Sequence, residues 1–268
     1  MAFETFLGND RMKENLSASL KKGHISHFYL ISGPQGSGKK TLARLISAAV
    51  LCQGREKPCL SCAVCRKVME NNHPDVITVE DPEHKAVAVK IVRQIREDVF
   101  IRPNESDHKI YIFPQELGTE GQNALLKILE EPPSYGVYIL LTDNAEKILP
   151  TVRSRCVELK LLPLEQSVLR RELERKFPQK DAADLSAAME CSGGFLGQAL
   201  ELLADDVQIG GLQAEIVYNA ADAQLIHADF SESFAQNAMI RMVNDSQPGK
   251  ISLVYTNLNG YTADGSAI

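Results

Sequence analysis

The segment from Gly33 to Lys39 has the residue types and spacing of a phosphate-binding loop. It reads Gly-Pro-Gln-Gly-Ser-Gly-Lys and fits the pattern G-x-x-x-x-G-K. Glycines such as Gly36 and Gly38 allow backbone N–H groups to curl around phosphate oxygens, and a following helix adds its positive dipole end. The Lys39 ammonium would reach the β- and γ-phosphates of a nucleotide. The alternative is a glycine-rich turn with a chance lysine.

The residue after Lys39 departs from this pattern. A Ser or Thr is expected there because its hydroxyl holds Mg²⁺, but the residue is Lys40. Thr41 comes one position late and is turned about 100° around the helix. A second ammonium group attracts phosphate but does not coordinate a cation. The loop is therefore compatible with ATP or ADP and poorly suited to metal-assisted hydrolysis; its candidate residues are Gly33, Gly36, Gly38, Lys39 and Thr41.

Four cysteines follow the phosphate loop at the spacing C-x6-C-x2-C-x2-C. Four thiolates with two tight C-x2-C steps suit a tetrahedral, structural Zn²⁺ ion. A site with four sulfur ligands has no open position, so the metal would fold a loop rather than do chemistry. The alternative is four unrelated thiols. The predicted ligands are Cys52, Cys59, Cys62 and Cys65, whereas Cys156 and Cys191 are expected to be small buried hydrophobic residues.

These candidate residues lie among alternating strands and helices. Residues 28–31, 109–113 and 137–141 are short apolar runs of the kind that form buried strands. Helical spacing of apolar residues is found at 16–22, 39–51, 89–100 and 122–131, and Pro132-Pro133 ends the last of these. Strands that alternate with helices predict an α/β fold with a parallel sheet covered on both faces.

Composition and charge divide the chain into three parts. The net charge is −6, and residues 205–268 hold 8 acidic and only 2 basic residues, so the whole deficit lies there. We expect a phosphate-loop core at 1–162 that contains the cysteine loop at 52–65. A small helical domain is expected at 163–204 and a C-terminal region of uncertain type at 205–268. The acidic balance argues against a strong stand-alone nucleic-acid binder.

The chain has no run of 18 or more apolar residues and does not begin with a signal-peptide pattern. A cytoplasmic protein without a membrane span is therefore expected. In a reducing compartment the six cysteines serve as metal ligands or buried thiols rather than disulfides.

Several motifs together resemble the AAA+ clamp-loader subunits of bacterial DNA polymerase III, over roughly residues 3–204. The resemblance implies an AAA+ core, a helical lid and a C-terminal helical collar. It further implies a five-subunit ring that opens the sliding clamp and places it on primed DNA. The motifs are Phe6-Leu7-Gly8-Asn9, His27-Phe28-Tyr29-Leu30, the phosphate loop, the four cysteines, His73-Pro74-Asp75-Val76, the run from Asn123 to Pro133 and Leu149 to Cys156.

In such rings ATP lies between neighbouring subunits, and the arginine of a Ser-Arg-Cys motif reaches the γ-phosphate held next door. Arg155 of Ser154-Arg155-Cys156 matches that arginine. The resemblance thus implies that Arg155 acts as a trans-acting arginine finger, which stabilises charge on the transferred phosphoryl group. The alternative is an ordinary surface or ion-paired arginine.

Three departures from the family pattern concern the chain's own ATP site. Lys40 replaces the Mg²⁺-binding hydroxyl, Pro114 stands where the strand at 109–113 should lead into Asp-Glu, and Gln198 replaces the arginine of the lid motif. Loss of such contacts lowers the rate of phosphoryl transfer by several orders of magnitude. We therefore expect a delta prime-type subunit without useful ATPase activity, whose partners are gamma/tau and delta in a hetero-pentamer, the sliding clamp and primer-template DNA.

Two other interpretations stay open: a gamma/tau-type ATPase, and a zinc-stabilised P-loop scaffold outside replication. The fold class expected is α/β: an AAA+ parallel sheet flanked by helices, with an inserted zinc knuckle, a helical lid and an atypical C-terminal tail. The tail does not resemble a helical collar. Residues 251–256 favour a strand, and residues 214–243 could be partly helical.

Overall fold

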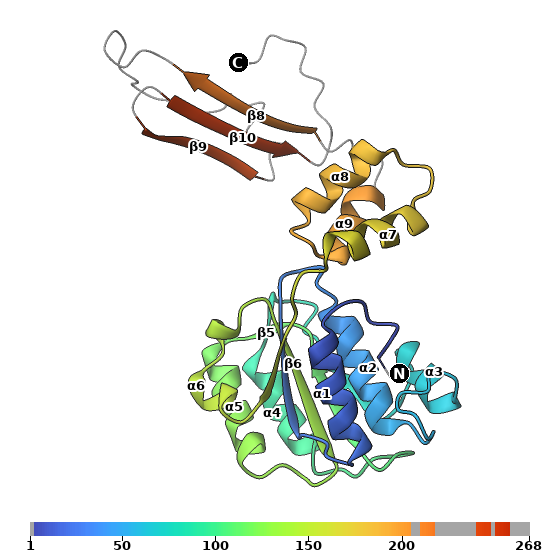
Figure 1. Cartoon of the computed structure of the whole chain (residues 1–268). Helices are drawn as coiled ribbons and strands as arrows, with labels where there is room; N and C mark the ends of the chain where they lie inside the picture. The colour runs from blue at the N-terminus through green and yellow to red at the C-terminus, as the bar shows by residue number, and fades with distance from the viewer. Residues whose placement is uncertain (1–2, 205–209, 218–239, 248–249, 258–268) are drawn as a thin grey trace. The chain divides into compact units, whose positions relative to one another are not determined.

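The computed structural model describes residues 3–204, 210–217, 240–247 and 250–257 of the chain (Figure 1). The chain divides into two compact units, residues 1–168 and residues 169–268. Each unit is described by itself. The boundary between them falls a few residues after the predicted end of the core at 162.

The first unit is built on a five-stranded sheet in which every neighbouring pair of strands is parallel. The predicted runs at 28–31, 109–113 and 137–141 are all strands of this sheet, which confirms them. A two-stranded parallel sheet of β3 (Ala86–Val87) and β5 (Glu116–Leu117) lies apart from it. The order of the main sheet is β2 (Val76–Thr78), β4 (Lys109–Phe113), β6 (Gly136–Thr142), β1 (Phe28–Ser32), β7 (Val157–Lys160).

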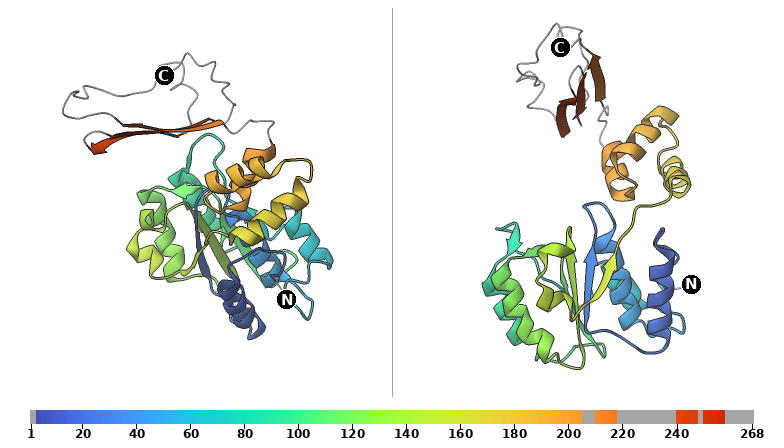
Figure 2. Two further views of the ribbon diagram at one scale, coloured as in Figure 1. Left: turned by 45° about the horizontal axis from the view of Figure 1, so that its top comes forward. Right: turned by 60° about the vertical axis from the view of Figure 1, so that its left-hand side comes forward.

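Helices cover both faces of the main sheet, as the right-hand view of Figure 2 shows. On one face, Tyr29 and Ile31 of β1 pack in an apolar cluster with α1 (Asp10–Lys21), α2 (Lys39–Leu51) and α3 (Ala63–Met69). On the other face, Phe28 and Leu30 pack in a second cluster. That second cluster involves the helices α4 (Val89–Asp98), α5 (Thr119–Glu130) and α6 (Pro150–Arg153). Alternate strand residues thus enter different cores, which explains why the strand sequences are apolar throughout.

The helix boundaries agree closely with the predicted ones, with two differences. The first helix begins at Asp10 rather than at 16, because Gly8 and Asn9 both adopt left-handed backbone angles and turn the chain just before it. The fifth helix begins at Thr119 rather than at 122, directly after Gly118. Sequence periodicity did not reveal these first turns because they contain few buried residues.

The second unit begins within a helical region. Its helices are α7 (Gln166–Lys176), which straddles the unit boundary, α8 (Ala182–Cys191) and α9 (Leu196–Ala204). Asp181 caps α8 by accepting a hydrogen bond from the Asp184 N–H at 2.8 Å. The region predicted to be helical, 163–204, contains these three helices; its role as a lid stays a prediction. Cys156 is half-buried as a partner of the second cluster, but Cys191 is exposed, so its predicted burial was wrong.

The C-terminal region contains an antiparallel sheet in the order β8 (Gly210–Val217), β10 (Lys250–Asn257), β9 (Ile240–Gln247). The strand predicted at 251–256 is confirmed within β10. Within the span 214–243, suggested as partly helical, residues 214–217 belong to β8 and residues 240–243 to β9. Residues 218–239 lie outside the described part. Among the described residues, no helix is long and apolar enough to cross a membrane.

Candidate functional site

The phosphate loop connects β1 to α2 at the carboxyl end of the sheet, which is where ligands bind in open α/β sheets. Gly36 and Gly38 have φ angles of 73° and 93°, a region that glycine adopts without strain. Gly38 is the N-cap of α2, so the unpaired N–H groups of the first turn begin at the loop. The loop residues Gly33, Gly36, Gly38 and Lys39 therefore lie together at this edge of the sheet.

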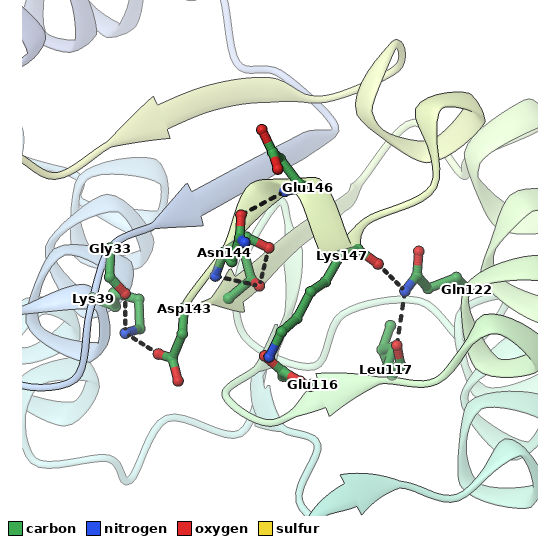
Figure 3. A network of polar contacts seen from close by, with 10 residues as sticks. Gly33, Lys39, Glu116, Leu117, Gln122, Asp143, Asn144, Glu146 and Lys147 are labelled. Atoms are coloured by element: carbon green, nitrogen blue, oxygen red, sulfur yellow. Dashed lines mark hydrogen bonds and ion pairs between the residues drawn. The ribbon is translucent and has the colours of Figure 1, made fainter. Parts of the chain in front are cut away.

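Lys39 is engaged within the chain (Figure 3). Its Nζ donates to the backbone carbonyl of Gly33 and, at 2.8 Å, to that of Pro34. It also makes an ion pair with Asp143 Oδ1 at 2.6 Å. The Asp143 side chain is mostly exposed, while that of Lys39 is 12% exposed. The group expected to hold nucleotide phosphates is thus bound to a carboxylate of its own chain.

The next two positions of the loop are Lys40 and Thr41. The Lys40 ammonium lies 3.7 Å from Glu80 Oε1, and both side chains are well exposed. Thr41 is exposed at the surface of α2. The ammonium group of Lys40 does not coordinate Mg²⁺.

No carboxylate directly follows β4, where the family pattern has Asp-Glu. Pro114 follows the strand, and the side chain of Gln115 is used structurally: its Nε2 donates to the carbonyls of Asp81 and His84 at 2.9 and 3.1 Å. Glu116, the first acidic residue, lies in β5 and pairs with Lys147 Nζ at 2.9 Å. A hydrogen bond to Glu116 raises the pKa of Lys147. The Glu116 carboxylate is therefore partnered by a cation of the chain (Figure 3).

Gln122 fixes the segment that carries Lys147. Its amide nitrogen donates to the carbonyls of Leu117 at 2.8 Å and Lys147 at 3.1 Å, and its oxygen accepts from the Leu149 N–H at 2.7 Å. Gln122 is buried, and its bond to the Leu117 carbonyl is shielded from water, whereas the other two bonds are part-buried. Figure 3 shows this amide beside the Lys147–Glu116 pair.

Arg155 lies between the end of α6 and the start of β7. Its side chain is exposed and donates to the Thr151 carbonyl at 2.9 Å and to Ser154 Oγ at 3.5 Å. Among the described residues, no carboxylate makes an ion pair with it. Nearby Arg153 instead pairs with Glu158 at 3.1 Å. Arg155 thus presents a guanidinium group whose charge is not neutralised by an acid of the described part of the chain.

The four cysteines predicted as ligands are brought together at the end of α2 and the start of α3. Their sulfur atoms all lie within 4.8 Å of one another, and the sulfurs of Cys59 and Cys65 are 3.9 Å apart. A tetrahedral Zn²⁺ with bonds of about 2.3 Å requires sulfur separations of roughly 3.8 Å. All four are free thiols. The donor set and its spacing therefore fit a single tetrahedral metal ion.

Backbone N–H groups point at these sulfurs as they do at metal thiolates. Gly54 donates to Cys52 Sγ at 3.3 Å, Cys62 to Cys59 Sγ at 3.4 Å, and Cys65 to Cys62 Sγ at 3.4 Å. Hydrogen bonds from the Ser61 backbone and side chain, and from the Cys62 N–H, lower the pKa of Cys59 to about 5. Burial instead raises the pKa of Cys65. A bound cation would favour the thiolate form of all four.

Sequence reasoning missed Asp143 and Lys147, the partners of Lys39 and Glu116. A signal for Asp143 existed, because it follows a predicted strand and carboxyl ends of parallel strands meet at one edge. Lys147 carried no such signal. Gln198, the third predicted departure, is half-buried in α9 of the second unit.

The chain was compared with known families and proteins. The family model described as "DNA polymerase III, delta subunit" matches residues 8–165. DNA polymerase III subunit gamma/tau of Mycobacterium tuberculosis is 32% identical over 228 residues, which cover 82% of this chain and 39% of the relative. DNA polymerase III subunit delta' of Bacillus subtilis is 30% identical over 199 residues, which cover 73% and 59% respectively. The chain thus spans less than two thirds of the length of these relatives.

Among solved structures, the RuvB Holliday junction branch migration motor of Thermotoga maritima superposes with a TM-score of 0.50. It is 17% identical, and the match covers 74% of this chain and 61% of that one. At this identity the likeness concerns the fold alone. The family model covers more than half of the chain. The chain is a member of the DNA polymerase III clamp-loader family of AAA+ proteins.

Proposed function

We propose that this chain is a delta prime-type subunit of a bacterial DNA polymerase III clamp loader. In this role it joins gamma/tau and delta subunits in a hetero-pentamer that loads the sliding clamp on primer-template DNA. It has no useful ATPase activity of its own and contributes Arg155 to ATP held by a neighbouring subunit. The observation that carries the proposal is a contrast: Lys39 is neutralised by Asp143 of its own chain, whereas the exposed Arg155 has no acidic partner among the described residues.

Loss of hydrolysis in this chain's own site has a chemical reason at each step. Phosphoryl transfer needs Mg²⁺ on the phosphates, a carboxylate near the metal and water, and unshielded positive charge. Lys40 stands where the Mg²⁺-binding hydroxyl is expected, and Pro114 stands where a carboxylate is expected. The nearby Glu116 is paired with Lys147. The positive charge of Lys39 is paired with Asp143. Any nucleotide in this site would serve a structural purpose.

Arg155 suits the role of a trans-acting arginine. A guanidinium group stays charged at every physiological pH and offers five N–H donors in a planar fork. Its present acceptors are one backbone carbonyl and one hydroxyl, which a phosphate can replace with a stronger, charge-assisted hydrogen bond.

The bound metal is proposed to be Zn²⁺. Four thiolates at tetrahedral separations select Zn²⁺ over the oxygen-seeking Mg²⁺ and Ca²⁺. Because all four positions are sulfur, the ion has no site for substrate and its role is structural.

A gamma/tau-type ATPase is the second candidate, since gamma/tau of Mycobacterium tuberculosis matches a larger share of the chain than delta' of Bacillus subtilis. The two candidates differ in one measurement, the ATPase activity of the purified chain with clamp and primed DNA. A scaffold outside replication is disfavoured by the family to which the chain belongs.

The decisive experiment is reconstitution of the loader with gamma/tau, delta and this chain from one organism. We expect the complex to co-purify and Arg155→Ala to lower its DNA- and clamp-stimulated ATPase at least about tenfold. The thermal unfolding of the isolated variant should stay within a degree or so of the wild type, because Arg155 is exposed.

Arg153→Ala is the matched control. It removes the same group two residues away, and Arg153 already pairs with Glu158. Its ATPase should stay within about twofold of the wild type. Unchanged turnover with Arg155→Ala, or equal losses in both variants, would refute the arginine-finger role.

A further inference from the structure

Lys39 uses its full donor capacity inside the chain. An ammonium group has three N–H donors. Here the three acceptors are the Gly33 carbonyl, the Pro34 carbonyl and Asp143 Oδ1. Two of them belong to the backbone of the phosphate loop itself. The Asp143 side chain is the one acceptor that can leave by rotating about its own bonds.

We propose that Asp143 is a built-in competitor for phosphate at Lys39. The polyphosphate chain of a nucleoside di- or triphosphate would take the position of the Asp143 carboxylate, so that this ion pair must break before Lys39 can hold a phosphate. The Lys39–Asp143 pair therefore acts as a latch that sets the nucleotide affinity of this site. It would act in the same way in a delta prime-type or a gamma/tau-type subunit.

Hydrogen bonds hold the backbone on both sides of Asp143 in place, and its carboxylate contacts Lys39 of the phosphate loop. Thr142 pairs with Ser32 across β6 and β1, and its carbonyl accepts from the Gly33 N–H at 3.1 Å. After Asp143, the Asn144 N–H donates to Thr142 Oγ1 at 3.2 Å, and Thr142 Oγ1 donates to the Asn144 carbonyl at 2.9 Å. Figure 3 shows Asp143 between this turn and Lys39.

The chemistry of the pair fits an anion competitor. A carboxylate and a phosphate both accept charge-assisted hydrogen bonds from an ammonium group at about 2.7–2.9 Å. Lys39 is nearly buried and Asp143 is 60% exposed, so the pair lies at the boundary between loop and solvent where a ligand would approach. Since only open molecules bind phosphate, the apparent Kd equals the intrinsic Kd divided by the open fraction.

The test compares nucleotide affinities of the whole chain and of variants by titration calorimetry with ATP and MgCl₂. Asp143→Asn keeps the size of the side chain and removes its charge. We expect it to tighten ATP binding by about two- to fivefold, because a partly exposed ion pair of this kind is of modest strength. Glu146→Gln is the matched control: Glu146 is exposed, three residues away, and makes no ion pair within the described residues. The Glu146→Gln variant should bind ATP with the affinity of the wild type.

Two further arms establish that the effect runs through Lys39. In a Lys39→Met background, Asp143→Asn should give no gain in ATP affinity. Adenosine, which lacks phosphates, should bind the wild type and Asp143→Asn equally. Asp143→Ala should tighten ATP binding in the same direction as Asp143→Asn.

Several results would overturn the latch. These are equal ATP affinity of wild type and Asp143→Asn, no measurable binding by either at millimolar ATP, or an equal gain with Glu146→Gln. A gain that persists in the Lys39→Met background would do the same. The role of Arg155 does not depend on this outcome, because it is measured as the ATPase activity of the assembled loader.

Discussion

Asp75 shows how a single buried charge can organise a loop far away in the sequence. Its carboxylate is fully buried and accepts hydrogen bonds from the N–H groups of Asn104, Glu105 and Ser106. Burial raises its pKa, but these hydrogen bonds outweigh burial, and the net pKa lies below the usual value of 3.8. Asp75 therefore pins the loop before β4, the strand that leads to Pro114. The sequence singled out this aspartate only within a family motif.

We predict that Asp75→Asn destabilises the first unit by about 2–3 kcal/mol at pH 7, because the N–H groups of Asn104, Glu105 and Ser106 lose a charged acceptor that is itself buried. The pKa of Asp75 is lower in the folded state than in the unfolded state. The charge of Asp75 therefore stabilises the fold above the unfolded-state pKa, and this stabilisation is lost as the pH falls through the folded-state pKa. The difference between wild type and variant should thus shrink as the pH drops below 3.8. Urea unfolding at neutral and acidic pH measures both.

Asp107→Asn serves as the control for Asp75→Asn, since Asp107 is exposed in the same loop. Its effect should stay within about 0.5 kcal/mol at either pH. A pH-independent difference for Asp75→Asn would mean that its charge does not contribute.

At the scale of elements, the cysteine loop links α2 to α3 and brings metal ligands into contact with the core. Cys52 and Cys65 are buried members of the apolar cluster under α1, α2 and α3. A Cβ on Gly54 would lie 3.2–3.4 Å from Cys52 and Cys59, so this turn leaves little room. The spacing of four cysteines was sufficient to predict this cluster, because the four residues are close together in the sequence.

We predict that the purified chain contains one Zn²⁺ and that Cys62→Ser loses it. Removal of a structural zinc should cost at least about 3 kcal/mol, which lowers Tm by roughly 6–12 °C in a unit of this size. Metal analysis and thermal unfolding with and without a strong chelator measure these effects.

Cys191→Ser is the control, since Cys191 is an exposed cysteine outside the cluster. It should keep the full zinc content and the wild-type Tm. Full zinc content in Cys62→Ser would show that Cys62 is not a ligand.

At the scale of the molecule, the first unit contains everything that a stable domain needs. Both apolar clusters on the two faces of the main sheet consist of residues from 1–168 alone. The cysteine site and the phosphate loop lie in the same unit. The C-terminal sheet of β8, β10 and β9 is antiparallel and pairs only with itself among the described residues.

We therefore expect a fragment of residues 1–168 to fold alone, with one cooperative unfolding transition and the zinc content of the whole chain. Calorimetry should find its Tm within about 5 °C of the matching transition in the whole chain. A fragment that is unfolded, or that unfolds without cooperativity, would contradict this expectation.

The sequence by itself determined the features whose causes are local. Strands, helices, the phosphate loop and the cysteine site each depend on residues close together along the chain, so periodicity and spacing were sufficient. Helix starts such as Asp10 and Thr119 were missed because turns rather than apolar residues set them. The strand at 251–256 was found, whereas the flanking strands were not.

Only the tertiary structure decided how the charges are paired. Lys39 and Asp143 are 104 residues apart, and Lys147 and Glu116 are 31 apart, so no local pattern connects them. They meet because β1, β4 and β6 are parallel neighbours and deliver their carboxyl ends to one edge of the sheet. The sequence could say that Lys39 suits a phosphate. The packing of strands brings a carboxylate to it.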